Sequence, residues 1–407
     1  MKILMSLAGQ YFPPDIRVEK EARTLLQAGH QVFLLCENRK DGLSEETVDG
    51  IKVLRIKTSP PGFWRRLWNA SCCRIYSPLW RKSLARIVEQ EKIEALHIHD
   101  LPMVKTGLSV ALGFGIPLVA DMHENYPIYV QVSRNNRNLR NRLLITIVDP
   151  VWVWKLLERH CLKRADRVIA VSDESREHFV QDCGVPSDKV TVVMNAEDPE
   201  DFCSIPIKDS IVKKYQYYFT ISYIGGFSYE RGIQTAIAAM PEIVQEIPNA
   251  RLLLVGSGTY ENALRPLAQE KEVAQAVEFT GHQPFSLVPS YVAASQVCLI
   301  PYIFSAQTDA SSPHKLFQYM AMGKPVIVSS MKSLGRVISE TGAGLVYTAG
   351  DADSLAEAVI KLHRNSELAH GMGEAGRKAV REKYNWSAEG RKLVNIYQNL
   401  HMGQGTH

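Results

Sequence analysis

Short apolar runs, each followed by a glycine-containing turn and a helical pattern, recur along this chain. Lys2–Leu7 leads through Gly9 to a helical pattern over 18–28, and Gln31–Cys36 is the next apolar run. A strand, a glycine loop, a helix and a second strand in this order predict a βαβ unit with parallel strands. The pattern continues with apolar runs at 95–99, 117–121, 167–172 and 190–194.

The polar segment 195–206 interrupts this pattern and is typical of a linker. The pattern then starts again with an apolar run at 219–224 and a helical pattern over 233–246. Further apolar runs lie at 251–255, 277–280, 297–300 and 325–329. Two α/β sandwiches in series are therefore predicted. Because ligands of such sheets bind beyond the carboxyl ends of the strands, we expect the active site in a cleft between them.

Composition narrows the class of protein. The 407 residues are 45% hydrophobic and 22% charged, as in a soluble globular protein. The chain has no apolar stretch of about 18 residues and no secretory signal at its start, so a cytoplasmic location is expected. The seven cysteines are scattered without CxxC spacing, which favours reduced thiols over a metal or redox site. Residues 1–170 hold 26 Lys and Arg against 17 Asp and Glu, so the first half is expected to meet an anionic partner.

Glycine loops mark the first candidate binding positions. Gly9 and Gln10 follow the first strand, but they are not part of a GxGxxG motif, which argues against an NAD enzyme. Gly225 and Gly226 precede Arg231 in the second half. Glycines let a backbone approach a phosphate closely, and a guanidinium matches phosphate oxygens. The alternative is an ordinary Gly-Gly turn before a helix.

The segment 309–326 carries the most information. Ser311 or Ser312 is expected to cap a helix that begins near Pro313 and ends before Gly323. The free N–H groups and positive dipole at the start of such a helix favour a diphosphate. Lys315 adds positive charge, and Gln318 lies two turns along, within reach of a ribose. The alternative is a capped helix without a ligand.

Histidines follow two strands of the first half. His97 and His99 precede Asp100, and His123 precedes Glu124. Two histidines without a third convergent ligand make a metal site improbable. One histidine that bonds a sugar hydroxyl or a phosphate is favoured instead, and His123 is the candidate. The pair Asp351 and Asp353 is expected to cap a helix rather than to bind metal.

The chain resembles a retaining glycosyltransferase of the GT-B fold, in the family four group (glycosyltransferase group 1). The resemblance covers nearly the whole chain and rests on the order and spacing of many short motifs. These lie at 12–17, 29–32, 95–100, 121–124, 165–172, 194–195, 223–232, 254–258, 279–281, 315–326 and 384–386.

The resemblance implies two Rossmann-like doubly wound α/β domains that face each other across a cleft. These would be an acceptor-side domain over 1–205, a nucleotide-sugar domain over 206–383, and a helix over 384–407 that returns to the first domain. It further implies a UDP- or GDP-sugar donor, no metal, no other cofactor, and transfer with retention. Since a departing diphosphate needs positive charge and hydrogen-bond donors more than a nucleophile, no nucleophile is assigned.

The same resemblance assigns roles to individual residues. His123 and Arg231 are the expected catalytic residues, with His123 by the sugar and Arg231 by the diphosphate. The expected donor-binding residues are Gly9, Gln10, Gly225, Gly226, Arg231, Gly256, Gly258, His282, Ser311, Ser312, His314, Lys315 and Gln318. The expected acceptor-side residues are Arg17, His99, Asp100 and Glu124.

Three positions depart from the family pattern. Two glutamates typical of the family are replaced by Ala310 and Gln318, and a typical arginine is replaced by Gly226. A glutamine can bond a ribose hydroxyl but carries no charge. These are interpreted as features of a branch of the family, with a catalytically silent nucleotide-sugar-binding protein as the alternative. A sugar-nucleotide epimerase of the same architecture is a third possibility.

Basic, tryptophan-rich stretches occur in the first half, at 62–68, 79–82, 134–142 and 151–155. This composition is typical of segments that lie in a membrane interface. Peripheral contact with the anionic inner membrane leaflet and a glycan or lipid-linked acceptor are therefore expected, in cell-surface polysaccharide or glycolipid assembly. Nothing resembles a nucleic-acid-binding module, so stacking on bases is disfavoured. Core tryptophans beside solvated arginines are the remaining interpretation.

Overall fold

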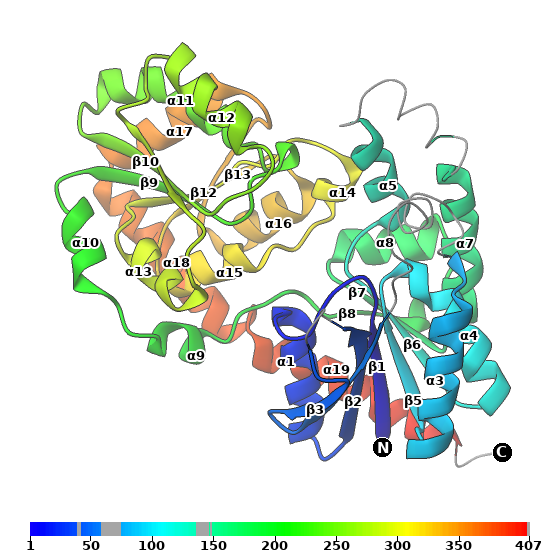
Figure 1. Cartoon of the computed structure of the whole chain (residues 1–407). Helices are drawn as coiled ribbons and strands as arrows, with labels where there is room; N and C mark the ends of the chain where they lie inside the picture. The colour runs from blue at the N-terminus through cyan, green and yellow to red at the C-terminus, as the bar shows by residue number, and fades with distance from the viewer. Residues whose placement is uncertain (39–41, 58–74, 136–145, 147–148, 405–407) are drawn as a thin grey trace. The chain divides into compact units, whose positions relative to one another are not determined.

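The computed structural model describes residues 1–38, 42–57, 75–135, 146 and 149–404. The chain forms two compact units, each an α/β sandwich (Figure 1). Unit 1 comprises Met1–Met194 with Glu389–His407, and unit 2 comprises Asn195–Ala388. The chain passes into the second unit at Asn195 rather than at residue 206. The reason is that Asn195 and Glu197 bond side chains or carbonyls of unit 2.

Unit 1 contains an eight-stranded sheet among the described residues, in the order β3-β4-β2-β1-β5-β6-β7-β8. Only β3 runs antiparallel to its neighbour. The strands are β1 (Lys2–Leu7), β2 (Gln31–Glu37), β3 (Glu45–Val48), β4 (Ile51–Ile56), β5 (Ala95–His99), β6 (Leu118–Met122), β7 (Arg167–Ala170) and β8 (Val190–Val192). The helices are α1 (Ile16–Gln27), α3 (Pro78–Glu91), α4 (Leu101–Phe114), α5 (Tyr126–Asn135), α7 (Val151–Arg164), α8 (Asp173–Gln181) and α19 (Trp386–Gln404).

Unit 2 contains a six-stranded parallel sheet in the order β11-β10-β9-β12-β13-β14, again within the described chain. The strands are β9 (Phe219–Ile224), β10 (Ala250–Val255), β11 (Val277–Gly281), β12 (Val297–Ile300), β13 (Val326–Ser329) and β14 (Gly344–Tyr347). The helices are α9 (Pro199–Ser204), α10 (Asp209–Tyr215), α11 (Ile233–Glu246), α12 (Glu261–Glu270), α13 (Val288–Ala293), α14 (Ala306–Asp309), α15 (His314–Ala321), α16 (Lys332–Thr341), α17 (Ala352–Arg364) and α18 (Ser366–Glu382).

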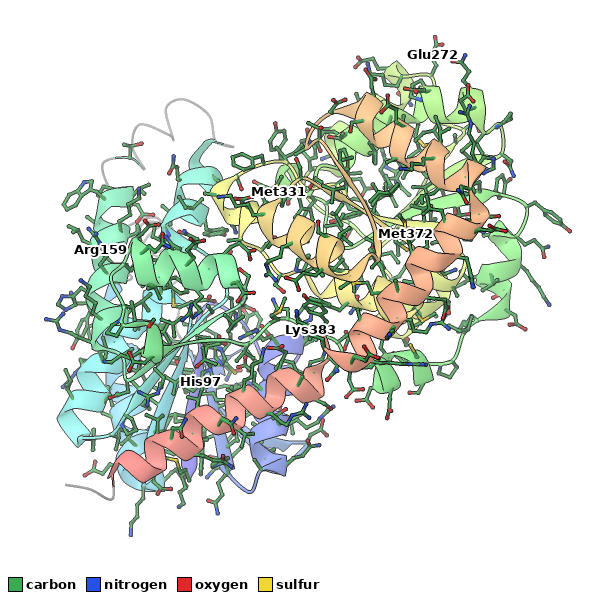
Figure 2. All side chains as sticks on the ribbon, turned by 180° about the vertical axis from the view of Figure 1, so that it is seen from behind. His97, Arg159, Glu272, Met331, Met372 and Lys383 are labelled. Carbon is green, nitrogen blue, oxygen red and sulfur yellow. The ribbon has the colours of Figure 1, made fainter. Side chains whose placement is uncertain are left out.

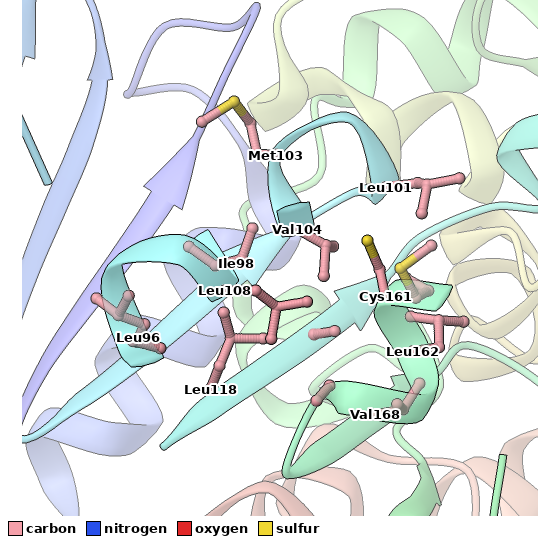
Figure 3. Packing of buried hydrophobic residues seen from close by; sticks show 14 of the residues in the cluster. Leu96, Ile98, Leu101, Met103, Val104, Leu108, Leu118, Cys161, Leu162 and Val168 are labelled. Atoms are coloured by element: carbon pink, nitrogen blue, oxygen red, sulfur yellow. The ribbon is translucent and has the colours of Figure 1, made fainter. Parts of the chain in front are cut away.

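The apolar runs of the sequence are the buried central strands of both sheets. On one face of the unit 1 sheet, β5, β6 and β7 pack against α4 and α7 through an apolar cluster (Figure 3). Its members include Leu96, Ile98, Leu108, Leu118 and Cys161, all buried. Side chains buried on both faces explain why most central strands are continuous apolar runs, whereas β5 alternates Leu96 and Ile98 with His97 and His99. The predicted two-sandwich α/β fold is therefore confirmed.

One strand of unit 1 has no signal in the sequence pattern. Strand β3 carries two glutamates and lies at the sheet edge, so it has no apolar run to reveal it. Helix α19 leaves unit 2 and packs in unit 1 from Glu389 onward, where Leu393 and Tyr397 are fully buried. This helix is the expected C-terminal return to the first domain.

Candidate functional site

The carboxyl ends of β5 and β6 in unit 1 carry a buried group of ionisable side chains, here called the polar cluster. It consists of Arg17, Glu21, His97, His99, Asp100, Asp121 and His123. His99 and Asp121 are register partners on parallel strands, so their side chains point to the same face. The Nδ1–H of His99 donates to Oδ2 of Asp121 at 3.1 Å. His97 lies on the same face, with its ring centroid 4.6 Å from that of His99.

Helix α1 supplies the arginine of the polar cluster. Asp15 caps this helix by accepting from the N–H of Val18, which puts Arg17 in its first turn. The guanidinium donates to both carboxylate oxygens of Asp121, at 2.8 and 3.2 Å, and lies 2.9 Å from Oε1 of Glu21. Since Arg17 is only 4% exposed, it serves as the buried counter-ion of Asp121 and lies beside Glu21, whose pKa burial raises to about 8. Its contact with an acceptor stays a prediction.

His123 closes the polar cluster toward solvent. Its Nε2–H donates to Oδ2 of Asp121 at 2.8 Å, and its Nδ1 lies 3.8 Å from Oδ2 of Asp100. Burial alone would lower the pKa of His123, but Asp100 and Asp121 outweigh it and raise the pKa to about 10. Burial also favours neutral Asp121, yet the charges of Arg17 and His123 hold its pKa well below the ordinary value. His123 is therefore an imidazolium at neutral pH.

Backbone strain occurs at Asp100. The residue has φ 62° and ψ 149°, a conformation that residues with a side chain rarely adopt. Its N–H donates to the carbonyl of Asp121 at 2.9 Å, which holds the strained turn in place. Strain of this kind costs about 1–3 kcal/mol and clusters at functional sites. The observation favours the predicted role of Asp100 at the site.

The C-terminal helix contributes to the polar cluster as well. The hydroxyl of Tyr397 and Nδ1 of His97 are 2.6 Å apart, and Nε2 of His97 lies 3.5 Å from Oε2 of Glu21. Figure 2 shows His97 in the region of α19. Burial and His97 lower the pKa of His99 to about 3, so His99 is neutral. Glu21, Asp121 and Tyr397 were absent from the predicted site.

Four residues of the polar cluster also have the chemistry of metal ligands. One ligand atom each from Glu21, His97, His99 and Asp121 lies within 4.8 Å of the others. However, Arg17 already engages both oxygens of Asp121 and contacts Glu21. Because this guanidinium supplies the positive charge that the carboxylates need, we assign no metal here.

The remaining predicted residues of unit 1 lie on loops. Gly9 has φ 77°, a conformation that favours glycine, and a Cβ at this position would have open space around it. The carbonyl of Gln10 accepts from the N–H of Glu37. Glu124 directly follows His123. Ligand contacts of Gly9, Gln10 and Glu124 stay predictions.

In unit 2, the loops after β9 and β10 pack backbone against backbone. Gly225 and Gly256 have φ 145° and 141°, and the N–H of Gly225 donates to the carbonyl of Val255. A Cβ on Gly256 would lie 2.0 Å from the carbonyl oxygen of Gly225, and one on Gly258 would lie 2.2 Å from that of Phe227. Gly256 and Gly258 are therefore explained by backbone packing alone, because any side chain there would collide with the neighbouring loop. Gly226 has no such neighbour within 4 Å.

Two cations lie over tyrosine rings beside these loops. Nζ of Lys315 is 3.9 Å from the ring centroid of Tyr223, and Cζ of Arg231 is 4.7 Å from that of Tyr302. Arg231 also donates to the hydroxyl of Tyr302. Neither cation forms an ion pair with a carboxylate in the described part of the chain. We call Tyr223, Arg231, Tyr302 and Lys315 the cation pair site.

The charge state of Lys315 responds to its surroundings. Burial, with a further contribution from the charge of Arg231, lowers the pKa of Lys315 well below its ordinary value. A Cβ on Gly225 would lie 2.5 Å from the same Nζ, so glycine is needed for the lysine to take this position. An anion bound here would offset both effects, since it would supply the missing negative charge.

Helix α15 begins without the predicted cap. Pro313 is the N-cap residue, and it makes no side-chain hydrogen bond to the first turn. The hydroxyl of Ser311 donates to the carbonyl of Thr308 instead, and the buried hydroxyl of Ser312 has no partner among the described residues. The predicted serine cap is therefore wrong, because the chain enters the helix through a proline. Ligand contacts of Ser311, Ser312 and His314 stay predictions.

Gln318 has a protein partner. Its Nε2–H donates to Oε2 of Glu197 at 2.8 Å, and both side chains are buried. The contact of Gln318 with a ribose stays a prediction, as does that of His282, which follows the last residue of β11.

The predicted cap of α17 is present, unlike the predicted serine cap of α15. Asp351 accepts from the N–H groups of Asp353 and Ser354.

The basic, tryptophan-rich stretches separate into two kinds. Trp80 and Trp154 are buried, so the core interpretation is right for them. Trp152 is 64% exposed on α7. The stretch at 62–68 and the segment 136–142 lie outside the described residues.

The comparisons with known proteins all lead to glycosyltransferases. A model described as "Glycosyltransferase Family 4" matches residues 16–201, and one described as "Glycosyl transferases group 1" matches residues 205–379. The phosphatidyl-myo-inositol mannosyltransferase of Mycolicibacterium smegmatis is 24% identical over 382 residues, which is 93% of this chain and 88% of the relative.

Solved structures share the fold. The sucrose-phosphate synthase of Thermosynechococcus elongatus matches with a TM-score of 0.79 at 19% identity, covering 99% of both chains. HepE from Anabaena, in complex with UDP, matches with a TM-score of 0.70 at 16% identity, covering 98% of this chain and all of HepE (100%). At these identities the likeness establishes the fold alone.

Proposed function

Because the chain belongs to the family four (group 1) glycosyltransferases of the GT-B fold, we propose that it transfers a sugar from a nucleoside-diphosphate donor with retention of configuration. The observation that carries this proposal is the cation pair site. Arg231 and Lys315 lie beside a glycine-rich loop without a carboxylate partner, so an external anion would complete them. A diphosphate has the required charge and oxygen spacing.

The chemistry requires charge at the leaving group. When the bond between the sugar and the diphosphate breaks, negative charge develops on the departing oxygens, and donors already in place lower that barrier. Arg231 and Lys315 supply such donors in unit 2, beside the positive end of the α15 dipole. These groups do the work that a metal ion does in other transferases. We therefore propose metal-independent transfer from a UDP- or GDP-linked sugar.

We place the acceptor at a membrane surface. Trp152, Lys155, Leu156 and Arg159 follow one face of α7, and all four side chains are exposed. Aromatic and aliphatic side chains beside cations favour the interface of an anionic bilayer. No helix in the described part of the chain is long and apolar enough to cross a membrane. A lipid-linked acceptor in surface glycan or glycolipid assembly is consistent with the phosphatidylinositol acceptor in the name of the mannosyltransferase relative.

Nucleotide binding tests the donor site directly. The unfolding temperature of the protein would be measured with UDP, GDP, ADP and dTDP, with and without EDTA. We expect one nucleotide to stabilise the protein regardless of EDTA, and Arg231→Ala to weaken its affinity by about 10–100-fold. Arg251→Ala is the matched control, because Arg251 also lies over a tyrosine ring (Tyr218) but at the start of β10.

Turnover then separates the candidate functions. Transfer from the matching nucleotide sugar, with the product anomer read by NMR, would support a retaining transferase. Binding without transfer or hydrolysis would support the silent alternative, which Ala310 and Gln318 motivate. No stabilisation by any nucleotide would overturn the proposed donor site.

Vesicle flotation tests the membrane contact. We expect the wild-type protein to float with anionic vesicles and the double variant Trp152→Ser, Leu156→Ser to lose most of this binding. Tyr217→Ser, which removes an exposed aromatic side chain of unit 2, should have no effect. Equal flotation of all three proteins would exclude α7 as the contact.

A further inference from the structure

Three side chains that bind transition metals meet between α7 and α8 of unit 1, apart from the polar cluster. They are Glu158 on α7, His178 on α8 and Cys183 just beyond α8. Oε2 of Glu158 lies 3.1 Å from Nε2 of His178 and 3.4 Å from Sγ of Cys183, and the latter two atoms are 3.8 Å apart. The three ligand atoms therefore form a compact triangle.

The end of α8 explains how the cysteine reaches this position. The N–H groups of Asp182 and Cys183 both donate to the carbonyl of His178, at 2.9 and 3.1 Å. Gly184 follows with φ 68°, a left-handed turn that ends the helix. The last turn is thereby closed on itself, and Cys183 lies beside the histidine one turn earlier.

The buried charges of this group are incompletely satisfied. Glu158 is 1% exposed and Cys183 is 2% exposed. Oε1 of Glu158 has no hydrogen-bond partner in the described part of the chain. A buried carboxylate is costly unless a cation accompanies it. In the polar cluster Arg17 fills that role for Asp121, whereas among the described residues Glu158 pairs with no arginine or lysine and has His178 as its partner at 3.1 Å. Burial lowers the pKa of His178, but Glu158 and Asp182 outweigh it and raise this pKa. A zinc ion would replace the proton that His178 holds against Glu158.

The triangle has the dimensions of one face of a tetrahedral zinc site. Zinc binds nitrogen and oxygen at about 2.0–2.2 Å and sulfur at about 2.3 Å, which puts the ligand atoms about 3.3–3.6 Å from one another. The observed 3.1, 3.4 and 3.8 Å lie close to these values. We propose that Glu158, His178 and Cys183 bind a zinc ion, with a water molecule as the fourth ligand.

The surroundings support this assignment. Nδ1–H of His178 donates to Oδ2 of Asp182 at 2.8 Å, which leaves Nε2 facing the other two ligands. A carboxylate on the far side of a ligand histidine is the usual arrangement in zinc sites. Arg159 of α7, labelled in Figure 2, donates in turn to the carbonyl of Asp182 at 2.9 Å. The His178 side chain is 23% exposed, so an ion and a water molecule have access.

Zinc binding here requires loss of a proton. Burial and then Glu158 raise the pKa of the Cys183 thiol, so the metal-free site holds S–H and not thiolate. Binding releases this proton to solvent, and the zinc affinity is therefore expected to fall as the pH falls. Because α8 starts at the carboxyl end of β7 and Cys183 follows its other end, the zinc would tie α7 to α8 away from the strand ends that carry the polar cluster.

Metal content of the whole purified chain tests the proposal. After incubation with excess zinc and gel filtration, we expect about one zinc per chain in the wild type and in Cys161→Ala, and little in Cys183→Ala. Cys161 is the matched control because it is equally buried on α7 but has no ligand partners. Cobalt in place of zinc should give the thiolate charge-transfer absorption in the wild type and in Cys161→Ala, but not in Cys183→Ala.

A variant outside the ligand set covers the case in which Cys183→Ala does not fold. Asp182→Asn keeps all three ligands and is expected to weaken zinc binding by about 10–100-fold. Substoichiometric zinc in the wild type, cobalt spectra without thiolate absorption, or unchanged affinity in both Cys183→Ala and Asp182→Asn would overturn the proposal. These measurements are independent of sugar transfer.

Discussion

At the carboxyl ends of its strands, unit 1 gathers ionisable side chains that bond one another. Unit 2 presents glycine backbones and two cations that have no carboxylate partner in the described part of the chain. In unit 1, the single carboxylate of Asp121 accepts hydrogen bonds from Arg17, His99 and His123. In unit 2, Arg231 and Lys315 lie over tyrosine rings. The same α/β architecture thus carries two different kinds of site. In unit 1 the charged side chains neutralise one another, and in unit 2 two cations lie where an anionic ligand would supply the opposite charge.

The difference shows that function follows from the site and not from the fold. A self-neutralised network is rigid and holds a few groups, such as His123, in a fixed charge state. An unpaired cation pair gains most when a ligand supplies the opposite charge. The comparison therefore predicts that removing charge harms the stability of unit 1, while adding side-chain atoms or carboxylates harms unit 2.

Removing the internal cation of unit 1 should have the largest effect. In Arg17→Met, Asp121 and Glu21 lose their shared counter-ion while both stay buried. We expect a loss of about 3–5 kcal/mol in the free energy of unfolding of unit 1, as for other broken buried pairs. Hydrogen exchange of the α1 and β6 amides would measure it.

The control for this variant is Arg23→Met. Arg23 lies on the same helix and pairs with Glu19 at 2.9 Å, but it is 48% exposed. Exposed pairs of this kind contribute about 0–1 kcal/mol. If both variants lost the same small amount, the polar cluster would not depend on its internal cation, and the contrast between the units would fail.

Adding a methyl group to unit 2 should rank next. Gly232 has φ 67°, and a Cβ there would lie 1.7 Å from the carbonyl oxygen of Pro301. Gly232→Ala forces that backbone apart, so we expect a loss of about 3 kcal/mol in the stability of unit 2. Gly226→Ala is the control, since a Cβ at Gly226 meets nothing within 4 Å. A stable Gly232→Ala, measured by hydrogen exchange in β9 and β12, would contradict the packing argument.

The fold was accessible from the sequence for a physical reason. Buried parallel strands require continuous apolar runs, and loops at their carboxyl ends require glycines, so both leave a local signal. Arg17, His99, Asp100 and His123, which the family resemblance had assigned to the site, lie together in unit 1, and their contacts with donor or acceptor stay predictions. Gly225, Arg231 and Lys315 likewise converge at one edge of unit 2.

What the sequence did not reveal depends on distant contacts. Tyr397 meets His97 across 300 positions of the chain, and no local pattern marks that pair. Glu197 lay in a segment that was interpreted as a linker, yet it binds Gln318. Glu21 had a weak signal, since it follows Arg17 by one helical turn on the buried face of α1. The cluster of Glu158, His178 and Cys183 was missed because its spacing matches no metal motif.

Restoring the glutamate typical of the family tests the departure at residue 318. Gln318→Glu would put a second carboxylate about where Nε2 now bonds Oε2 of Glu197 at 2.8 Å. One of the two must then be protonated, which raises its pKa above the unfolded value. Stability is therefore retained at low pH and lost as the pH rises, by about 2 kcal/mol at neutral pH.

Gln269→Glu on the exposed surface of α12 is the control for charge alone and should change stability little. A Gln318→Glu protein as stable as the wild type at pH 8 would mean that Glu197 moves away freely. In that case the bond between Gln318 and Glu197 would not define the site.

The smallest effect is expected from the charge of His123. Its pKa is raised from 6.5 to about 10, so the folded state binds a proton that the unfolded state releases above pH 6.5. This contribution is complete below pH 6.5 and disappears as the pH approaches 10. His123→Asn should thus destabilise the protein clearly at pH 6 and much less at pH 10, measured by urea unfolding. His160→Asn, at an exposed position on α7, should show a pH dependence of the opposite sign, because burial and Arg164 lower the pKa of His160. A flat profile for His123→Asn would mean that Asp100 and Asp121 do not hold the imidazolium, and unit 1 would lose the fixed charge that distinguishes it from unit 2.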